Sequence, residues 1–188
     1  MRKPHDELRA EIMSQAGQLL EREGVRGLSA RRLAGAAGCS VGTLYNLFDH
    51  LDGVVRALNK DTMQRLAAVL AKADPGEEAG RPARLEALGL AYLGFGLANS
   101  ARWELLFRYR LETPAEETLA ELETLLALLR RVAGPKPTDE ALTALWAAVH
   151  GIVELAVARR LPNAAEGAEG RMIALVIAAG VKGIAPET

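Results

Sequence analysis

The sequence predicts an all-α protein with an N-terminal three-helix domain followed by a larger helical domain. Apolar residues recur three and four positions apart along most of the 188 residues, whereas a strand would alternate apolar and polar residues. Glycine, proline and capping residues divide this pattern into segments of helical length. Hydrophobic residues make up 49% of the chain, which is enough to bury a core in one domain or in two small ones.

Two helices are expected before the glycine at position 38. The first ends at Gly24, because glycine readily adopts the left-handed conformation that terminates a helix. Ser29 is placed to cap a short second helix over residues 30–37, which Gly38 ends. The first helix carries its apolar stripe at Leu8, Ile12, Ala16, Leu19 and Leu20.

A third helix is expected over residues 41–48, with Ser40 as its N-cap. Its apolar residues are spaced i, i+3, i+4 and i+7, so we expect one face to pack inward; they are Val41, Leu44, Tyr45 and Phe48. The opposite face would then present small or hydrogen-bonding residues: Ser40, Gly42, Thr43 and Asn46.

The C-terminal two-thirds of the chain reads as a series of further helices. A long connecting helix is expected over residues 51–73, and the polar segment "DPGEEAG" that follows is the clearest internal boundary. We divide the chain into residues 1–50 and residues 51–188. The later helices are expected over residues 82–100, around 102–111, over 114–133, from a Thr138 cap to Pro162, and over 171–184.

Composition and charge exclude several classes of protein. The formal net charge is −1, so any nucleic-acid or membrane partner must be recognised locally. The single cysteine, Cys39, can form neither an internal disulfide nor a thiolate metal cage. The charged N-terminus does not resemble a secretory signal, and the longest apolar stretch is too short to span a bilayer. We expect a cytoplasmic protein without a membrane partner, cofactor or bound metal.

The residues around Ser40 also match G-x-S-x-G, the pattern of a nucleophilic serine. That serine requires a preceding strand, but "RRLAGAA" lacks the β-branched and aromatic residues that a buried strand favours. We therefore expect no catalytic residue here. Two short helices joined by a turn at Gly38, with small polar residues exposed on the second, instead predict a helix-turn-helix.

Residues 28–55, "LSARRLAGAAGCSVGTLYNLFDHLDGVV", resemble the DNA-binding signature of the TetR family of transcriptional regulators. The resemblance implies an N-terminal helix-turn-helix domain and a C-terminal helical domain for ligand binding and dimerisation. It also implies that Ser29 and Tyr45 bind phosphates, that Thr43 and Asn46 face bases or nearby phosphates, and that Arg31 and Arg32 flank the DNA backbone. The full set of DNA-binding residues that we expect is Ser29, Arg31, Arg32, Ser40, Gly42, Thr43, Tyr45, Asn46 and His50.

One position departs from the family pattern. The family usually has a lysine three residues after the aromatic residue that ends the recognition helix, and this chain has Leu51. Residues 1–50 hold seven Lys or Arg and six Asp or Glu, so their net charge is only +1. We expect the missing contact to be replaced by His50 or by basic residues near the N-terminus: Arg2, Lys3 and Arg9.

Small residues are frequent in the last two predicted helices. They permit close helix approach, either in a symmetric four-helix dimer interface or within one subunit. We favour the homodimer, because a palindromic double-stranded DNA operator requires two reading heads. The small residues are Ala141, Ala144, Ala147, Ala148 and Gly151, then Ala174, Ala178, Ala179 and Gly183.

Aromatic residues are concentrated in the C-terminal part, where a small, largely apolar effector would bind. Trp146, His150 and Gly151 resemble the Trp-His-Gly pattern of one C-terminal subfamily, and Trp146 and His150 share a helix face. His150 would be the polar anchor of the site; a plain aromatic core is the alternative. The expected ligand-binding residues are Tyr92, Phe95, Trp103, Phe107, Trp146 and His150.

Two other side-chain patterns have simpler explanations than function. His150 and Glu154 lie four residues apart on one helix, but two ligands are too few for a metal site. Cys39 lies in the helix-turn-helix turn, where oxidation would block DNA, although a free cysteine usually behaves as a small buried hydrophobe.

The expected function is a homodimeric repressor that an effector releases from its operator. A helical interaction module that does not bind DNA, or a small helical enzyme that uses Ser40 or His150, are the alternatives.

Overall fold

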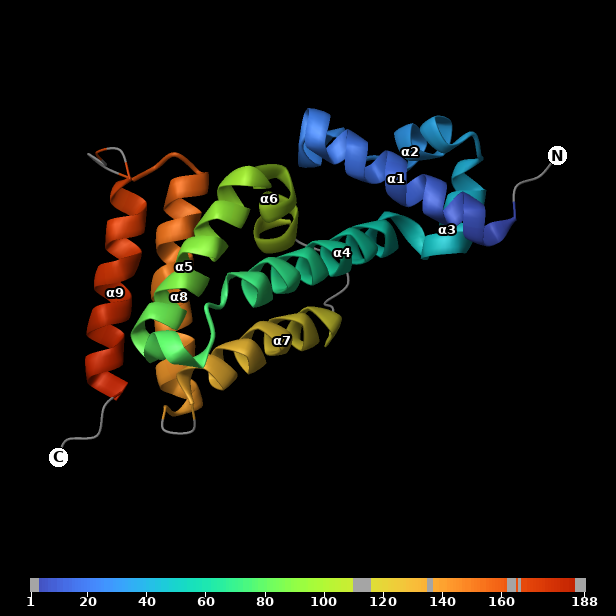
Figure 1. Ribbon diagram of the computed structural model, residues 1–188. Coiled ribbons are helices and arrows are strands. Elements are labelled where there is room, and N and C mark those ends of the chain that lie inside the picture. The colour runs from blue at the N-terminus through green and yellow to red at the C-terminus, as the bar shows by residue number, and fades with distance from the viewer. Residues whose placement is uncertain (1–3, 110–115, 135–136, 162–164, 166, 185–188) are drawn as a thin grey trace. The chain divides into compact units, whose positions relative to one another are not determined.

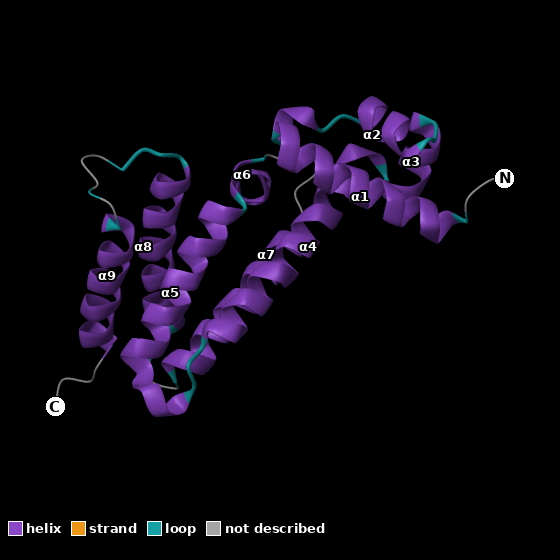
Figure 2. Cartoon of the chain, turned by 45° about the horizontal axis from the view of Figure 1, so that its top comes forward, coloured by secondary structure: helices purple, strands orange, loops and turns teal. Residues whose placement is uncertain are grey.

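The computed structural model describes residues 4–109, 116–134, 137–161, 165 and 167–184. In these ranges the chain forms nine α-helices and two short 3-10 helices and contains no strand, as Figure 2 shows. The prediction of an all-α fold is therefore confirmed.

The chain divides into two compact units. The first comprises Met1–Gln64 and Asn99–Glu116, and the second comprises Arg65–Ala98 and Glu117–Thr188. The helix α4 (His50–Ala73) contributes its first turns to the first unit and its last turns to the second. The functional division at residue 50 stays a prediction.

The helices of the first unit are α1 (His5–Glu23), α2 (Ala30–Ala37), α3 (Val41–Phe48), the first part of α4 and α6 (Ser100–Arg108), with the 3-10 helix η1 (Val25–Gly27) after α1 (Figure 1). The end of α1 and both ends of α2 and α3 lie where the capping residues predict, whereas α4 begins one residue earlier than expected and α6 lies at Ser100–Arg108 instead of around residues 102–111. Gly24 and Gly38 have φ angles of 68° and 69°, as their roles as helix terminators require.

A single hydrophobic core holds the first unit together. The apolar stripe of α1 packs against the buried faces of the other helices, with Ile12, Leu20, Leu33 and Leu44 completely buried. From α4 the core receives Val54, Val55 and Leu58, and from α6 it receives Leu105. Leu44 and Phe48 belong to this core, so it holds α3 in place through the buried face of the helix.

A buried arginine joins three helices of this unit. Arg102 of α6 is only 5% exposed, and its Nη1 lies 2.9 Å from Oδ2 of Asp61 and 3.2 Å from Oγ1 of Thr62 on α4. Its Nε lies 3.6 Å from Oε1 of Glu21 on α1. A Cβ at Gly17 would come within 3.3 Å of the Arg102 Nη2, so the guanidinium lies directly against α1.

The second unit contains the last turns of α4, then η2 (Glu77–Ala79), α5 (Gly80–Ala98), α7 (Glu116–Ala133), α8 (Asp139–Val157) and α9 (Ala168–Ile184). Figure 1 shows α5, α8 and α9 side by side, and all three pairs are in contact. Glycines permit this close packing, because a Cβ at Gly89 would lie 2.7 Å from Ile173 Cγ2 and one at Gly180 would lie 2.9 Å from Leu145 Cδ1.

The segment predicted as a polar linker is an ordered turn. The Asp74 carboxylate accepts two hydrogen bonds from Arg84, at 2.8 and 2.7 Å, and one from the Gly76 backbone N–H at 3.1 Å. The Arg84 guanidinium lowers the pKa of Asp74 to about 2. This pair connects the end of α4 to the start of α5.

The helix α8 begins as predicted and ends earlier than predicted. Thr138 caps it, with Oγ1 accepting from the Ala141 N–H at 3.3 Å. It ends at Val157, and Arg159 adopts a left-handed φ of 53°, whereas Pro162 lies outside the described residues. By length and composition α8 could cross a membrane, but a core helix passes the same test, and one face of α8 is buried against α5 and α9.

Candidate functional site

The helices α2 and α3 form a tightly turned pair. Ser29 caps α2, its Oγ accepting from the Arg32 N–H at 3.4 Å. After the left-handed Gly38, the Cys39 N–H donates to the Ala34 carbonyl at 2.9 Å and closes the end of α2. Only Gly38, Cys39 and Ser40 separate the two helices, and this is the connection that a helix-turn-helix requires.

Ser40 caps α3 and does not occupy a nucleophile elbow. Its Oγ accepts from the Thr43 N–H at 3.0 Å and lies 2.8 Å from the Thr43 Oγ1. The element that precedes Ser40 is the helix α2, so the strand that a nucleophile elbow needs is replaced by a helix.

The outward face of α3 is small and polar. Ser40, Gly42 and Asn46 are exposed and Thr43 is half-buried, while Leu44 and Phe48 are buried on the opposite side. With no large side chain in this row, a second surface can approach the helix backbone closely. The expected division of α3 into two faces is confirmed for these residues.

The expectation that Tyr45 packs inward is wrong. Tyr45 is 36% exposed, and its ring lies 4.7 Å from that of His50, centroid to centroid. Leu44 and Phe48 are the residues of α3 that are buried in the core, and Tyr45 instead lines a polar hollow of about 320 Å³. This hollow is lined by Tyr45, Asp49, His50, Leu51, Asp52, Arg56 and Tyr109.

The junction between α3 and α4 is unusually tight. Asp49 and His50 both adopt left-handed conformations, with φ angles of 51° and 70°. A Cβ added at Gly53 would lie 1.4 Å from the carbonyl oxygen of Phe48, so only glycine fits there. The angle between α3 and α4 depends on this contact, which sequence analysis did not identify.

Two of the basic residues near α3 are engaged within the protein. Arg32 forms a bidentate ion pair with Glu23, with both N–O distances at 2.6 Å. Arg9 donates to the Leu47 carbonyl at 2.6 Å, and its guanidinium lies 4.2 Å from the centre of the Phe48 ring.

The other basic residues differ in their exposure. Arg31 is exposed, and the His50 side chain is 71% exposed. Arg2 and Lys3 lie outside the described residues.

Cys39 is half-buried in the α2–α3 turn. Burial raises the pKa of its thiol, so less of the reactive thiolate is present at neutral pH. The structural interpretation of this cysteine is the better supported one.

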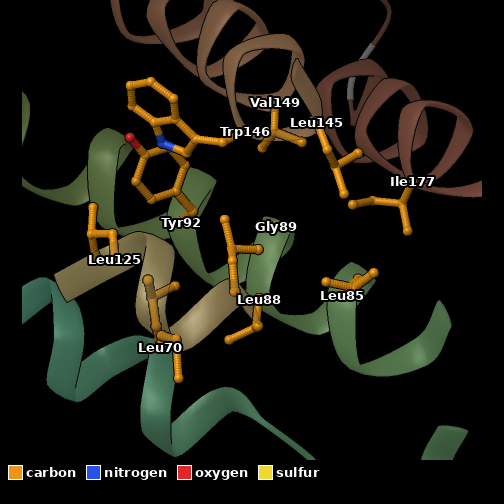
Figure 3. Close-up of a pocket in the computed structure, with 12 residues that line it drawn as sticks. Leu70, Leu85, Leu88, Gly89, Tyr92, Leu125, Leu145, Trp146, Val149 and Ile177 are labelled. Carbon is orange, nitrogen blue, oxygen red and sulfur yellow. The ribbon is translucent and has the colours of Figure 1, made fainter. Parts of the chain in front are cut away.

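A second candidate site is an apolar cavity of about 50 Å³ inside the second unit. Side chains from α4, α5, α7, α8 and α9 surround it, and Figure 3 shows Leu70, Leu88 and Leu125 facing Val149 and Leu145 across it. Its lining residues are Leu70, Leu85, Leu88, Gly89, Tyr92, Leu125, Leu128, Leu129, Leu145, Trp146, Val149 and Ile177.

Polar atoms of the cavity lie at one end. The Tyr92 hydroxyl is 2.9 Å from Nδ1 of His150, and the His150 ring stacks on Trp146 with centroids 5.0 Å apart. Burial raises the pKa of Tyr92, which the Trp146 N–H opposes, and burial lowers the pKa of His150, which Glu154 opposes. Both groups are therefore neutral at physiological pH.

The expected ligand-binding residues fall into three groups. Tyr92 and Trp146 line the cavity, while His150 lies behind them and touches both. Phe95 is buried but is not a lining residue. Trp103 and Phe107 belong to α6 in the first unit, where Trp103 is completely buried and the two rings lie 4.6 Å apart.

The described residues contain no group of three His, Cys, Asp or Glu that could hold a metal ion. Nδ1 of His150 lies 2.9 Å from the Tyr92 hydroxyl.

The helices α8 and α9, which pack against each other, both expose small and apolar residues. A Cβ at Gly151 would meet no described atom within 4 Å, and Leu175 is 69% exposed. Ala141 and Ala174 are half-buried, and the burial of Gly183 is not among the described properties. The exposed residues are Ala144, Ala147, Ala148, Gly151 and Leu155 on α8, with Met172, Leu175, Ala178 and Ala179 on α9.

Comparison with known proteins gives a family match and several similar structures. Residues 85–179 match the family described as tetracyclin repressor-like, C-terminal domain. A protein of unknown function from Rhodococcus sp. RHA1 is 27% identical, with 95% of this chain and 96% of that chain covered and a TM-score of 0.77.

Two further solved structures share the fold. The TetR family transcriptional regulator PfmR from Thermus thermophilus is 20% identical, with 93% of this chain and 99% of that one covered and a TM-score of 0.59. A TetR-like transcriptional regulator from Rhodococcus sp. RHA1 is 18% identical, with 97% and 100% covered and a TM-score of 0.66. Among curated proteins, no relative matches the sequence.

Proposed function

The chain belongs to the TetR family, and from this we propose that it is a transcriptional regulator that binds a palindromic operator as a homodimer. The observation that carries the proposal is the capped α2–α3 pair, which presents a small polar face on a helix fixed from behind by Leu44 and Phe48. A helix presented in this way fits the major groove of DNA.

The exposed face of α3 supplies the groups that would read DNA. Asn46 is exposed and offers an amide, which pairs with adenine in the major groove, and Thr43 lies one turn earlier on the helix. Ser29, Ser40, Gly42, Tyr45 and His50 would contact the backbone or allow its close approach, with Arg31 beside them.

Arg32 would bind phosphate only by sharing its guanidinium with Glu23 or leaving it. Leu51 replaces the usual lysine of the family, and the nearby His50 is the exposed group best placed to substitute for it.

The exposed small and apolar residues of α8 and α9 support the homodimer. They combine close-approach residues such as Gly151 and Ala148 with the exposed apolar side chains of Leu155 and Leu175. Burying these residues against a second copy would remove apolar surface from water in an isologous four-helix interface.

The cavity of the second unit supports effector binding. An apolar cavity of about 150 Å³ binds benzene, whereas this one measures about 50 Å³, so lining side chains must move when a ligand of that size enters. Leu70 lines the cavity near the end of α4, and Gly53 abuts α3 near its start.

We therefore propose that an effector shifts α4 and changes the placement of α3, so that the dimer no longer fits successive major grooves. A coupling free energy of about 1–3 kcal/mol is enough for such a switch. Repression is the default mode in this scheme, and membership of the Trp-His-Gly subfamily stays a prediction. The protein would act in the cytoplasm, without catalytic activity.

The proposal is tested by selecting bound sequences from a random DNA pool with the purified protein at near-physiological salt. We expect a palindromic sequence to be enriched. Asn46→Ala should weaken binding to that sequence by about 1–3 kcal/mol, because one base contact is lost. Gln18→Ala on the exposed side of α1 is the matched control and should bind like the wild type.

Failure to enrich any sequence, with a folded dimer confirmed by light scattering, would contradict DNA binding and favour a helical interaction module. Enrichment with unchanged binding by Asn46→Ala and Thr43→Ala would instead contradict the assigned residues and leave the regulator proposal in place.

A further inference from the structure

The apolar cavity has two properties that restrict what can bind in it. None of its twelve lining residues carries a charge, and most are leucine, isoleucine or valine. An ionised carboxylate or ammonium group would lose its hydration there without gaining an opposite charge. The walls thus select an uncharged, mainly apolar molecule.

The polar end of the cavity adds a second requirement. The indole N–H of Trp146 is buried and lies close enough to the Tyr92 oxygen to affect the Tyr92 pKa, but it has no partner among the described residues at hydrogen-bonding distance and angle. Figure 3 shows the Trp146 and Tyr92 side chains next to each other, and the Tyr92 hydroxyl is itself engaged with Nδ1 of His150. Because indole can only donate a hydrogen bond, the group that satisfies Trp146 must be an acceptor.

The neighbouring side chains fix the orientation of the Trp146 indole and the protonation state of Tyr92. The His150 ring stacks on Trp146 with an interplanar angle of 23°, so the indole cannot rotate without losing that contact. Tyr92 is 4% exposed and stays protonated, which leaves its phenol as a neutral hydrogen-bonding group at the same end of the cavity.

We propose that the effector is a small uncharged molecule whose single neutral oxygen, most favourably a hydroxyl, accepts a hydrogen bond from Trp146. A hydroxyl accepts from the indole and donates to the Tyr92 oxygen at the same time, whereas a hydrocarbon leaves the indole unsatisfied. The inference rests on the proposed effector role of the cavity and names the chemistry that this site recognises.

Three probes of similar size separate the effects of the apolar ring, the hydroxyl group and a negative charge on binding. They are toluene, phenol and benzoate. They share one ring, so the movement of side chains that admits the ring is common to them, and only the polar group differs. Binding is measured by calorimetry and by the shift in melting temperature, on the full chain without DNA. We expect phenol to bind at least tenfold more tightly than toluene, and benzoate not to bind.

Two variants assign the effect to the indole. Trp146→Phe should reduce the preference for phenol over toluene to about one while toluene still binds, because the cavity keeps an aromatic wall. Trp103→Phe changes the other tryptophan, which lies in the first unit, and should leave the preference unchanged.

Tight binding of benzoate, a preference for toluene in the wild type, binding of none of the probes, or an unchanged preference in Trp146→Phe would each overturn the inference. The operator assay is separate. Selective phenol binding that never alters operator affinity would uphold this inference and contradict ligand release. Enriched operator binding without any probe binding would support the DNA-binding proposal and contradict this inference.

Discussion

Substitution of Asp61 tests the role of the buried arginine in the first unit. Asp61→Ala removes the carboxylate whose Oδ2 lies 2.9 Å from Nη1 of Arg102, and leaves a guanidinium that is only 5% exposed. Removing one partner of a fully buried pair costs about 3–5 kcal/mol. The Asp61 side chain is 38% exposed and Glu21 remains nearby, so we expect the lower end, about 3 kcal/mol.

The measurement is urea denaturation followed by circular dichroism, at a fixed protein concentration because dimerisation would contribute to stability. A loss of this size should lower the melting temperature by about 6–12 °C for a chain of this length. Glu21→Gln is the control: its side chain is 62% exposed and 3.6 Å from Arg102, so we expect less than about 1 kcal/mol.

A double substitution separates the buried charge from the lost contact. Replacing Asp61 with Ala and Arg102 with Met removes the buried charge and keeps most of the apolar volume of the arginine stem. We expect the double variant to be more stable than Asp61→Ala alone. If Asp61→Ala costs no more than Glu21→Gln, Arg102 is adequately solvated and the reasoning is refuted.

Two further predictions concern the first turn after α3 and the turn after α4. Gly53→Ala places a Cβ 1.4 Å from the Phe48 carbonyl oxygen, so α3 must move; we expect at least a tenfold loss of operator affinity in a binding titration. Gly35→Ala meets open space in α2 and should stabilise the protein by about 0.5–1 kcal/mol, and equal behaviour of the two variants would contradict the close contact. Arg84 lowers the folded-state pKa of Asp74 from 3.8 to about 2, so its contribution is complete above the unfolded pKa and disappears as the pH falls through the folded value. We expect Asp74→Asn to be less stable than the wild type at neutral pH in thermal melts, with the difference shrinking between about pH 4 and pH 2; a difference that is constant down to pH 2 would count against the ion pair.

The helix boundaries that carry a capping residue could be predicted from the sequence because their signals are local. Ser29, Ser40 and Thr138 each bond a backbone N–H three residues away, and Gly24 and Gly38 terminate helices through their own backbone conformation. Such interactions are complete within one helical turn, so they depend little on the rest of the fold.

The contacts that the sequence did not reveal join residues that are far apart in the chain. Arg102 and Asp61 are separated by 41 positions, and Tyr92 and His150 by 58. The periodicity of apolar residues does not record such partners, and the sequence analysis did not single out Arg102. Tyr45 was misplaced for a related reason, because its spacing matches the buried face although only Leu44 and Phe48 of α3 are fully buried.

The candidate DNA-binding residues could be identified from the sequence signature. The signature could not show whether each side chain is free to contact DNA or is already held by another residue of the protein. Sequence alone could not show that Arg32 is held by Glu23, because the pairing depends on how α1 and α2 pack. The same holds for the cavity. The sequence indicated that aromatic residues are concentrated in the C-terminal part, but only the structure shows that Tyr92 and Trp146 line the cavity while Trp103 lies in the first unit.

The contacts that Arg9 and Arg32 make within the protein affect how its affinity for an operator would depend on ionic strength. Arg9 is held by the Leu47 carbonyl and the Phe48 ring, and Arg32 by Glu23, so these two of the seven basic residues in 1–50 are less available to displace the counterions condensed on a duplex. Each neutralised phosphate contributes about 0.9 to the slope of log affinity against log salt concentration. An operator complex in which Arg9 and Arg32 keep these partners would therefore release fewer ions than one in which both arginines bind phosphate, and its affinity would fall less steeply with rising salt concentration.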